Sequence, residues 1–130
     1  MNKKMILGAA GLILLAASCK NDDDTVLIGG KGGNATLHIT ARHHARTIDS
    51  AMVYIKYNAT NLPTSFDDSA KVVKTATDTT ATISGLKKGT YYLYGYGWDK
   101  SIGDTVLGGV PYTITAERDI NLILQVTEGD

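Results

Sequence analysis

Hydrophobic and polar residues alternate along most of the chain after residue 35, and no segment there keeps a 3.6-residue apolar period. Such alternation is typical of half-buried β-strands, because successive side chains of a strand point to opposite faces. In 50–57, for example, Ala51, Val53, Ile55 and Tyr57 share one face. The pattern predicts seven short strands, at 35–41, 50–57, 70–75, 79–84, 90–98, 105–115 and 119–126.

Turn residues separate these segments, and seven short strands spaced in this way indicate a two-sheet β-sandwich. The sixth segment contains Gly108, Gly109 and Pro111, which predict a break within it. The sequence therefore predicts an all-β domain over residues 35–127.

The first residues have a different pattern. Lys3 and Lys4 precede an apolar run over 5–17, and the only cysteine, Cys19, follows it. As a helix, this run would span about 20 Å, less than the roughly 30 Å of a membrane's hydrocarbon core, which favours a secretory signal. The stretch resembles a bacterial lipoprotein signal, although Ala16 stands where most such signals have Leu. The resemblance implies removal of a signal peptide over 1–18 and a diacylglyceryl group on Cys19.

The residues after Cys19 resemble the export signal that places some lipoproteins on the outer face of the outer membrane. The resemblance implies an anchored protein that faces the cell exterior, whereas the alternative is a plain polar tether. Residues 19–34 are interpreted as the lipidated cysteine and an acidic, glycine-rich tether. The residues that carry the export signal are Lys20, Asp22, Asp23 and Asp24.

Charge narrows the choice of partners. The chain has 13 basic and 13 acidic residues, and removal of 1–18 takes two lysines and no acid, which leaves a formal charge of −2. Nucleic acid is not an expected partner, because its binding needs a basic surface. The outer membrane is an expected partner through the acyl chains on Cys19, which anchor a protein stably.

The segment 83–93, Ile-Ser-Gly-Leu-Lys-Lys-Gly-Thr-Tyr-Tyr-Leu, joins an apolar strand end, a basic turn and an aromatic strand. It resembles the signature of transthyretin-like sandwiches, the carboxypeptidase regulatory-like domains and collagen-adhesin B-type repeats. The resemblance implies a seven-stranded Greek-key β-sandwich over 35–127 that serves as a non-catalytic module.

The sequence contains no clear catalytic motif and no histidine spacing that suits a metal site. No Gly-x-Ser-x-Gly elbow is present, and the cysteine is committed to lipid. Along an extended strand His38 and His44 lie too far apart to chelate one ion, and His43 points the other way. Residues 42–46 are therefore interpreted as a solvated loop tip, and neither an enzyme, a metal nor a cofactor is expected.

The most aromatic segment is 90–98. If Tyr91 and Leu93 face the core, the even-numbered aromatic residues form a ladder on the opposite face that is large enough to bind a partner. The alternative packs these rings inward, but Gly95 and Gly97 are poor core fillers, which favours the exposed arrangement. The candidate binding residues are Tyr92, Tyr94, Tyr96 and Trp98.

A tripeptide that begins Asp-Ser or Asp-Thr occurs five times, and it resembles a bacterial O-glycosylation acceptor. The alternative is that Asp, Ser and Thr simply serve as turn and strand-start residues. The candidate acceptors are Thr25, Ser50, Ser69, Thr79 and Thr105.

These features predict a lipid-anchored outer-membrane surface protein whose β-sandwich binds an envelope partner or a glycan. An accessory subunit of an uptake complex is one form of that function. The alternative is a structural stalk or spacer without a specific ligand.

Overall fold

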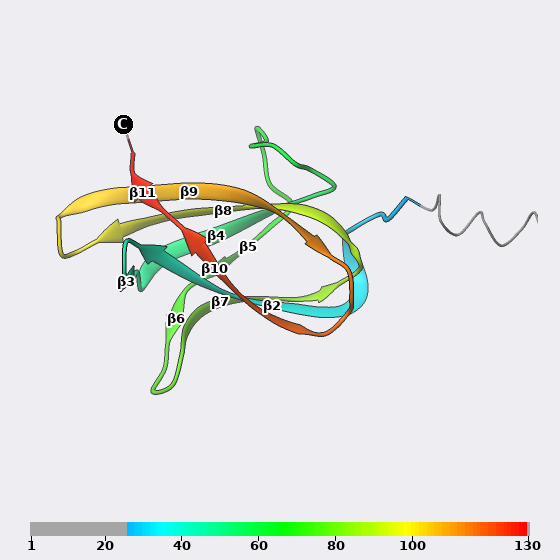
Figure 1. Ribbon diagram of the computed structural model, residues 1–130, viewed down its shortest axis with the longest axis horizontal. Helices are drawn as coiled ribbons and strands as arrows, with labels where there is room; N and C mark the ends of the chain where they lie inside the picture. Colours follow the sequence, from blue (N-terminus) through cyan, green and yellow to red (C-terminus); the bar gives the residue numbers. More distant parts are fainter. Residues whose placement is uncertain (1–25, 130) are drawn as a thin grey trace, which may run out of the picture.

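A computed structural model of the protein describes residues 26–129, which form two β-sheets around a common core (Figure 1). In the first sheet the strand order is β10 (Asp119–Gln125), β2 (Lys31–His43), β7 (Thr79–Leu86) and β6 (Val73–Lys74), and β3 (Arg46–Thr47) also pairs with β2. In the second sheet it is β11 (Thr127–Glu128), β9 (Asp104–Ile114), β8 (Gly89–Asp99), β4 (Ser50–Tyr57) and β5 (Asp68–Lys71).

All neighbouring strands are antiparallel except β10 and β2, which run parallel with Asp119 opposite Thr36 and Gln125 opposite Arg42. Residues 26–129 include no helix that could cross a membrane. The prediction of an all-β fold is confirmed.

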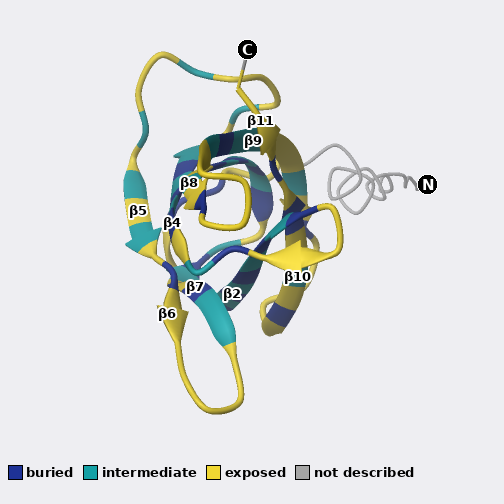
Figure 2. Cartoon of the chain, turned by 90° about the vertical axis from the view of Figure 1, so that its left-hand side faces the viewer, coloured by how far each residue is buried: buried dark blue, intermediate teal, exposed yellow. Residues whose placement is uncertain are grey.

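The core forms where the two sheets face each other. Alternate residues of the long strands β2, β4 and β8 are buried, and Figure 2 shows dark blue alternating with lighter bands. On β4 the residues predicted to share one face do face the core. Val53 and Ile55 are fully buried, and Tyr57 packs at the margin of the core. Other fully buried apolar side chains include Leu37, Ile39, Leu86, Leu93, Val106 and Ile114.

The predicted tether over 19–34 extends too far, because β2 begins at Lys31 and Gly29 and Gly30 are already buried. The glycines of this segment allow neighbouring groups to approach the backbone closely, because they have no side chain. A side-chain Cβ at Gly29 would lie 2.8 Å from Cζ of Tyr91, and one at Gly33 would overlap the carbonyl oxygen of Leu86. The glycine-rich stretch is therefore part of the folded domain.

The predicted break within 105–115 is absent, because β9 runs without interruption from Asp104 to Ile114. Pro111 lies opposite Tyr92 of β8, while β11 pairs only with Val106 and Leu107. At Pro111 the strand is consequently an edge strand, where a missing N–H is tolerated. Gly109 leaves room for the ring of Tyr92.

The segment 70–75, predicted as one strand, contributes to both sheets. Its first half ends β5 in the second sheet, and Val73 and Lys74 form β6 in the first. Val72 between them is 3% exposed and its N–H donates to the carbonyl of Ala51. The chain therefore crosses from one sheet to the other at a buried residue.

We expect Gly33→Ala to lower the free energy of unfolding by about 2–3 kcal/mol, because the added methyl group overpacks against the backbone at Leu86. The control is Gly103→Ala, where nothing lies within 4 Å and only the left-handed φ of 64° opposes the change. It should cost about 1 kcal/mol. Urea denaturation measures both, and an unchanged stability for Gly33→Ala would contradict the folded role of this segment.

Candidate functional site

The outer face of β8 carries the aromatic ladder. Tyr91 and Leu93 are fully buried, as the alternation requires, and the even-numbered rings point away from the core. Tyr96 is 49% exposed and Trp98 is 48% exposed. These two rings are therefore open to a partner.

Gly95 and Gly97 share the inner face of β8 with Tyr91 and Leu93, so their small size does not favour the exposed arrangement of the rings. Gly95 is buried, and a Cβ there would lie 2.9 Å from Leu124 Cδ2 and 3.2 Å from Val126 Cγ1. The side chains of the C-terminal segment thus fill the space that Gly95 leaves. The predicted facing of the ladder agrees with the structure, but the reason given for it does not.

Two members of the ladder pack within the domain. Tyr94 stacks on Phe66 with ring centroids 5.8 Å apart and 19° between the planes, and Tyr54 lies 6.5 Å away. Burial raises the pKa of the Tyr94 hydroxyl. Tyr92 lies over Gly109, so neither Tyr92 nor Tyr94 offers the free face that Tyr96 and Trp98 do.

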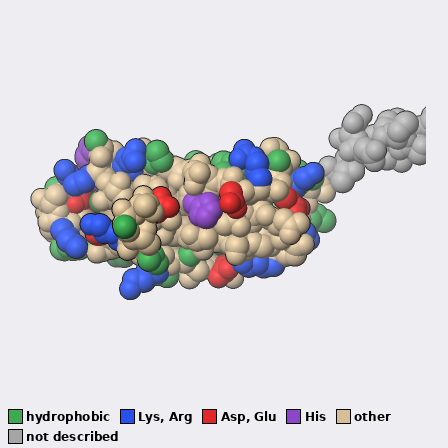
Figure 3. Space-filling view, turned by 90° about the horizontal axis from the view of Figure 1, so that it is seen from below, with side chains coloured by type: hydrophobic (Ala, Val, Ile, Leu, Met, Phe, Trp, Pro, Cys, Tyr) green, Lys and Arg blue, Asp and Glu red, His purple; other side chains and the backbone are tan. Residues whose placement is uncertain are grey.

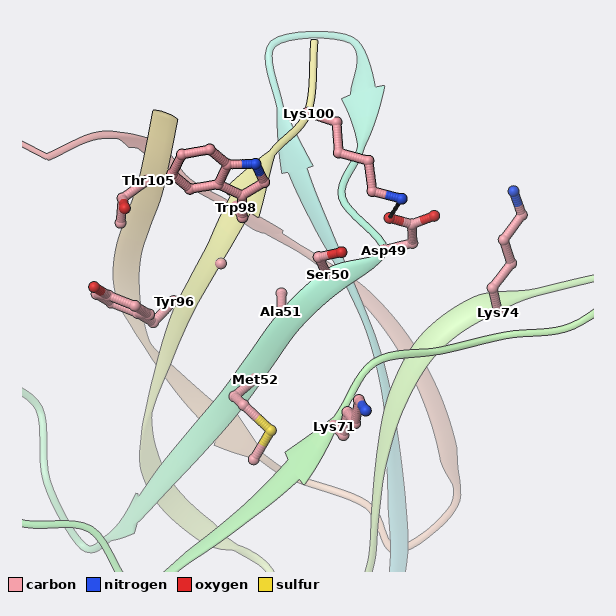
Figure 4. A pocket seen from close by; sticks show the side chains of 11 residues that line it. Asp49, Ser50, Ala51, Met52, Lys71, Lys74, Tyr96, Trp98, Lys100 and Thr105 are labelled. Atoms are coloured by element: carbon pink, nitrogen blue, oxygen red, sulfur yellow. Dashed lines mark ion pairs between the residues drawn. The ribbon is translucent and has the colours of Figure 1, made fainter. Parts of the chain in front are cut away.

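Tyr96 and Trp98 line a pocket of about 660 Å³ on the second sheet (Figure 4). Ala51 and Met52 of β4 lie across its middle, and the two rings of β8 stand on one side of them. The opposite side carries lysines from β5 and β6, and one end carries a further lysine beside an aspartate. We call this hollow the aromatic groove, lined by Asp49, Ser50, Ala51, Met52, Lys71, Lys74, Tyr96, Gly97, Trp98, Lys100 and Thr105.

Positive charge predominates in the aromatic groove. Lys100 Nζ lies 3.7 Å from Asp49 Oδ1, but the ion pairs formed among residues 26–129 include none from Lys71 or Lys74. Elsewhere the charges are mixed, and the face in Figure 3 shows basic and acidic side chains interspersed. The aromatic groove thus combines two exposed aromatic rings with two lysines, Lys71 and Lys74, that have no acidic partner in the described part of the chain.

A second cluster lies at the same end of β8 but on its inner side. The side chain of His43 is 1% exposed, so the prediction of a solvated loop tip over 42–46 is wrong for this residue. Its Nδ1 lies 2.8 Å from Asp99 Oδ2 and its Nε2 lies 3.1 Å from Glu128 Oε1. His43 continues the buried parity of Leu37, Ile39 and Ala41, and that continuation is the signal in the sequence that could have placed it inward.

Electrostatics in this cluster favour the charged carboxylates. The hydrogen bond to Asp99 is the main influence that raises the pKa of His43. Asp99 accepts hydrogen bonds from the Ser101 hydroxyl at 2.6 Å and the Ser101 N–H at 2.9 Å, and these bonds with that of His43 hold its pKa far below the usual range. A hydrogen bond from its own backbone and then the contact with His43 lower the pKa of Glu128.

The glycosylation candidates all stand at strand starts where the structure describes them. Ser50 and Ser69 are exposed, whereas Thr79 and Thr105 are half-buried. The side chains of Asp68 and Asp104 accept hydrogen bonds from the N–H groups of the residues that follow them, at 2.8 Å and 2.7 Å. The tripeptide thus has a structural use in the folded chain. Thr25 lies outside the described residues, as do the signal peptide, Cys19, Lys20 and Asp22–Asp24.

Comparison with protein-family models, curated proteins and solved structures found no match. The arrangement of the side chains therefore carries the functional argument. It brings Tyr96 and Trp98 together with three lysines, and it separates them from Tyr92 and Tyr94.

The division of the ladder predicts different effects on stability. Tyr94→Ala should lower the free energy of unfolding by about 2 kcal/mol, because it removes a stacked, half-buried ring. Tyr96→Ala should change it by no more than about 0.5 kcal/mol, because the ring is exposed. Thermal and urea denaturation compare the two variants. Equal losses of stability would show that the ladder is not divided in this way.

Proposed function

We propose that this protein is a lipid-anchored surface protein of the bacterial outer membrane whose sandwich domain binds an anionic glycan in the aromatic groove. The observation that carries the proposal is the half-exposed pair Tyr96 and Trp98 beside Lys71 and Lys74. Tyr and Trp supply large contact area at low entropic cost, and both are enriched at binding sites.

The rings suit a sugar chain by their spacing. Residues two apart on a strand lie about 6.6 Å from each other, a length comparable with one sugar ring. Both rings project from the same face of β8, so successive sugars can lie flat against them. Met52, which lies opposite Tyr96 on the outer face of the sheet, gives the aromatic groove an apolar surface for the carbon-bound hydrogens of the sugars.

The lysines favour acidic over neutral sugars. Lys71 and Lys74 stand on the side of the aromatic groove opposite the rings, where a carboxylate or sulfate group on a bound glycan can reach them. Because these amines are exposed to solvent, their attraction for an anion is modest and weakens with salt. The expected specificity is therefore for a repeated negative charge along a chain.

We also propose a fold family for the domain, and its support comes from β8, the strand that carries Tyr96 and Trp98, and from the turn before it. We infer a transthyretin-like Greek-key sandwich, supported by the buried Tyr91 of the Gly-Leu-x-x-Gly-x-Tyr core and by left-handed φ at Gly85 (74°). A module of this kind also suits the alternative role of a stalk. A stalk, however, has no need for two exposed aromatic rings beside lysines that lack acidic partners, which favours the binding function.

The anchoring proposal rests on Cys19 and on the acidic residues after it. The folded domain begins near Gly29, so Cys19 and the residues up to Ile28 form the connection to the membrane. A protein attached in this way can present the aromatic groove to glycans outside the cell. An accessory role in an uptake complex follows if the bound glycan is a nutrient.

We expect Tyr96→Ala and Trp98→Ala each to weaken binding of an anionic polysaccharide about fivefold or more, because removal of a central aromatic contact costs upward of about 1 kcal/mol. Lys71→Gln should weaken binding less and reduce its dependence on salt. Isothermal titration with carboxylated and sulfated polysaccharides measures these effects, with dextran as the neutral comparison.

Two exposed residues outside the aromatic groove provide matched controls. Ile123→Ala removes a 48% exposed apolar side chain of β10, and Lys88→Gln removes an exposed lysine of the turn before β8. Neither should alter binding. The proposal fails if the aromatic variants keep the wild-type affinity, or if dextran binds as tightly as the acidic chains.

Lipidation makes an independent prediction. The mature protein should begin at Cys19 and carry acyl mass, whereas Cys19→Ala should leave the protein unlipidated and release it from the outer-membrane fraction. Intact-mass spectrometry and membrane fractionation test both statements. Continued fractionation of the Cys19→Ala form with the outer membrane would contradict the anchor.

A further inference from the structure

Three potential ligands for a metal ion meet where the first and second sheets end. One ligand atom each from His43, His44 and Glu128 lies within 4.8 Å of the other two. His43 ends β2, His44 begins the turn that follows, and Glu128 belongs to β11. The folded topology brings these residues together across 85 positions of the chain.

His43 is held in the orientation of a metal ligand. Its Nδ1 bonds to the Asp99 carboxylate at 2.8 Å, and both side chains are almost completely buried. Histidines that bind metals commonly use one ring nitrogen for such a carboxylate, which fixes the ring and directs the other nitrogen to the ion. Here the other nitrogen, Nε2, faces Glu128.

The distance between the first two ligand atoms suits zinc. Zinc binds histidine nitrogen and carboxylate oxygen at about 2.0–2.2 Å in tetrahedral geometry, which places neighbouring ligand atoms about 3.4 Å apart. His43 Nε2 and Glu128 Oε1 are 3.1 Å apart, close to that separation. Small movements of the exposed Glu128 side chain are enough to admit an ion between them.

His44 supplies the third ligand from an unusual backbone conformation. Its φ of 57° is left-handed, which residues other than glycine seldom adopt. This conformation places its ring centroid 4.4 Å from that of His43. The ring is exposed and can turn toward the same point.

We propose that His43, His44 and Glu128 bind a divalent zinc ion, with Asp99 as the positioning residue for His43. Three protein ligands leave the remaining coordination position open to solvent. Arg46 lies near the site, but its Nε contacts Asp99 Oδ2 at 3.7 Å rather than a ligand atom. The ion would connect the end of β2 to β11. The expectation of no metal rested on the spacing of the histidines and on the charges of Arg42 and Arg46, and it did not include Glu128.

The test is zinc binding by the tag-free mature protein, measured by isothermal titration and by the shift in melting temperature. We expect one zinc ion per chain and an increase in melting temperature, because an ion that binds only the folded state stabilises it. His44→Ala and Glu128→Gln should each abolish binding or weaken it at least tenfold. His44 is exposed, so His44→Ala should keep the wild-type melting temperature without zinc, whereas Glu128→Gln also changes the hydrogen bond to the buried His43 and should lower it slightly.

Asp99→Asn tests the positioning role. It should weaken zinc binding about 10–100-fold while leaving one ion per chain. The imidazole nitrogen signals of His43 and His44 in NMR spectra should shift on zinc addition, in the wild type as well as in His38→Ala.

His38→Ala is the matched control, because His38 is the one histidine of the chain outside the proposed site. It lies on β2, beside Asp119 of β10. It should bind zinc as the wild type does. The proposal is overturned if the wild type does not bind zinc, if His44→Ala and Glu128→Gln bind as tightly as the wild type, or if His38→Ala loses binding. The first outcome would leave His43 as a hydrogen-bonded link between Asp99 and Glu128.

Discussion

The buried hydroxyl of Tyr91 fixes the strand on which the rest of the structure depends. It donates to the carbonyl of Lys87 at 2.7 Å and accepts from the N–H of Gly30 at 2.8 Å, and its ring packs edge-on against Tyr57. These bonds satisfy the one polar group of a fully buried side chain. They also tie β8 to the turn before it and to the N-terminal segment. Because side chains alternate along a strand, a slip of one residue would turn every outward ring of β8 into the core.

Because side chains alternate between the two faces of β8, the neighbouring residues Trp98 and Asp99 contact different sites at one end of the sandwich. Trp98 points outward into the aromatic groove, and Asp99 points inward and holds His43. The position of Asp99 is in turn fixed by Ser101, whose hydroxyl and N–H both bond to the carboxylate. A change in the loop after β8 would therefore affect the buried histidine and the exposed tryptophan together. The proposed glycan site and the proposed zinc site are chemically independent but share this support.

Local patterns in the sequence predicted the strands, and the failures have a common physical cause. Alternation placed Val53 and Ile55 correctly, because burial of one strand face depends on residues close in sequence. Gly33 was misread as flexible linker, because a glycine needed for close approach looks the same in sequence as one needed for freedom. The partners of His43 lie 56 and 85 residues away, so only the folded topology could bring them together. The stacking of Tyr94 on Phe66 across a loop was hidden for the same reason.

Trp98 is the single tryptophan of the chain, so its fluorescence reports directly on the proposed glycan site. The decisive measurement is the emission spectrum and acrylamide quenching of the mature protein during titration with an acidic polysaccharide. We expect a solvent-exposed emission that quenches readily in the free protein, and a blue shift with protection from acrylamide as the glycan binds. An emission that is already blue-shifted and protected without glycan, or one that no acidic polysaccharide changes, would contradict a glycan site at Trp98.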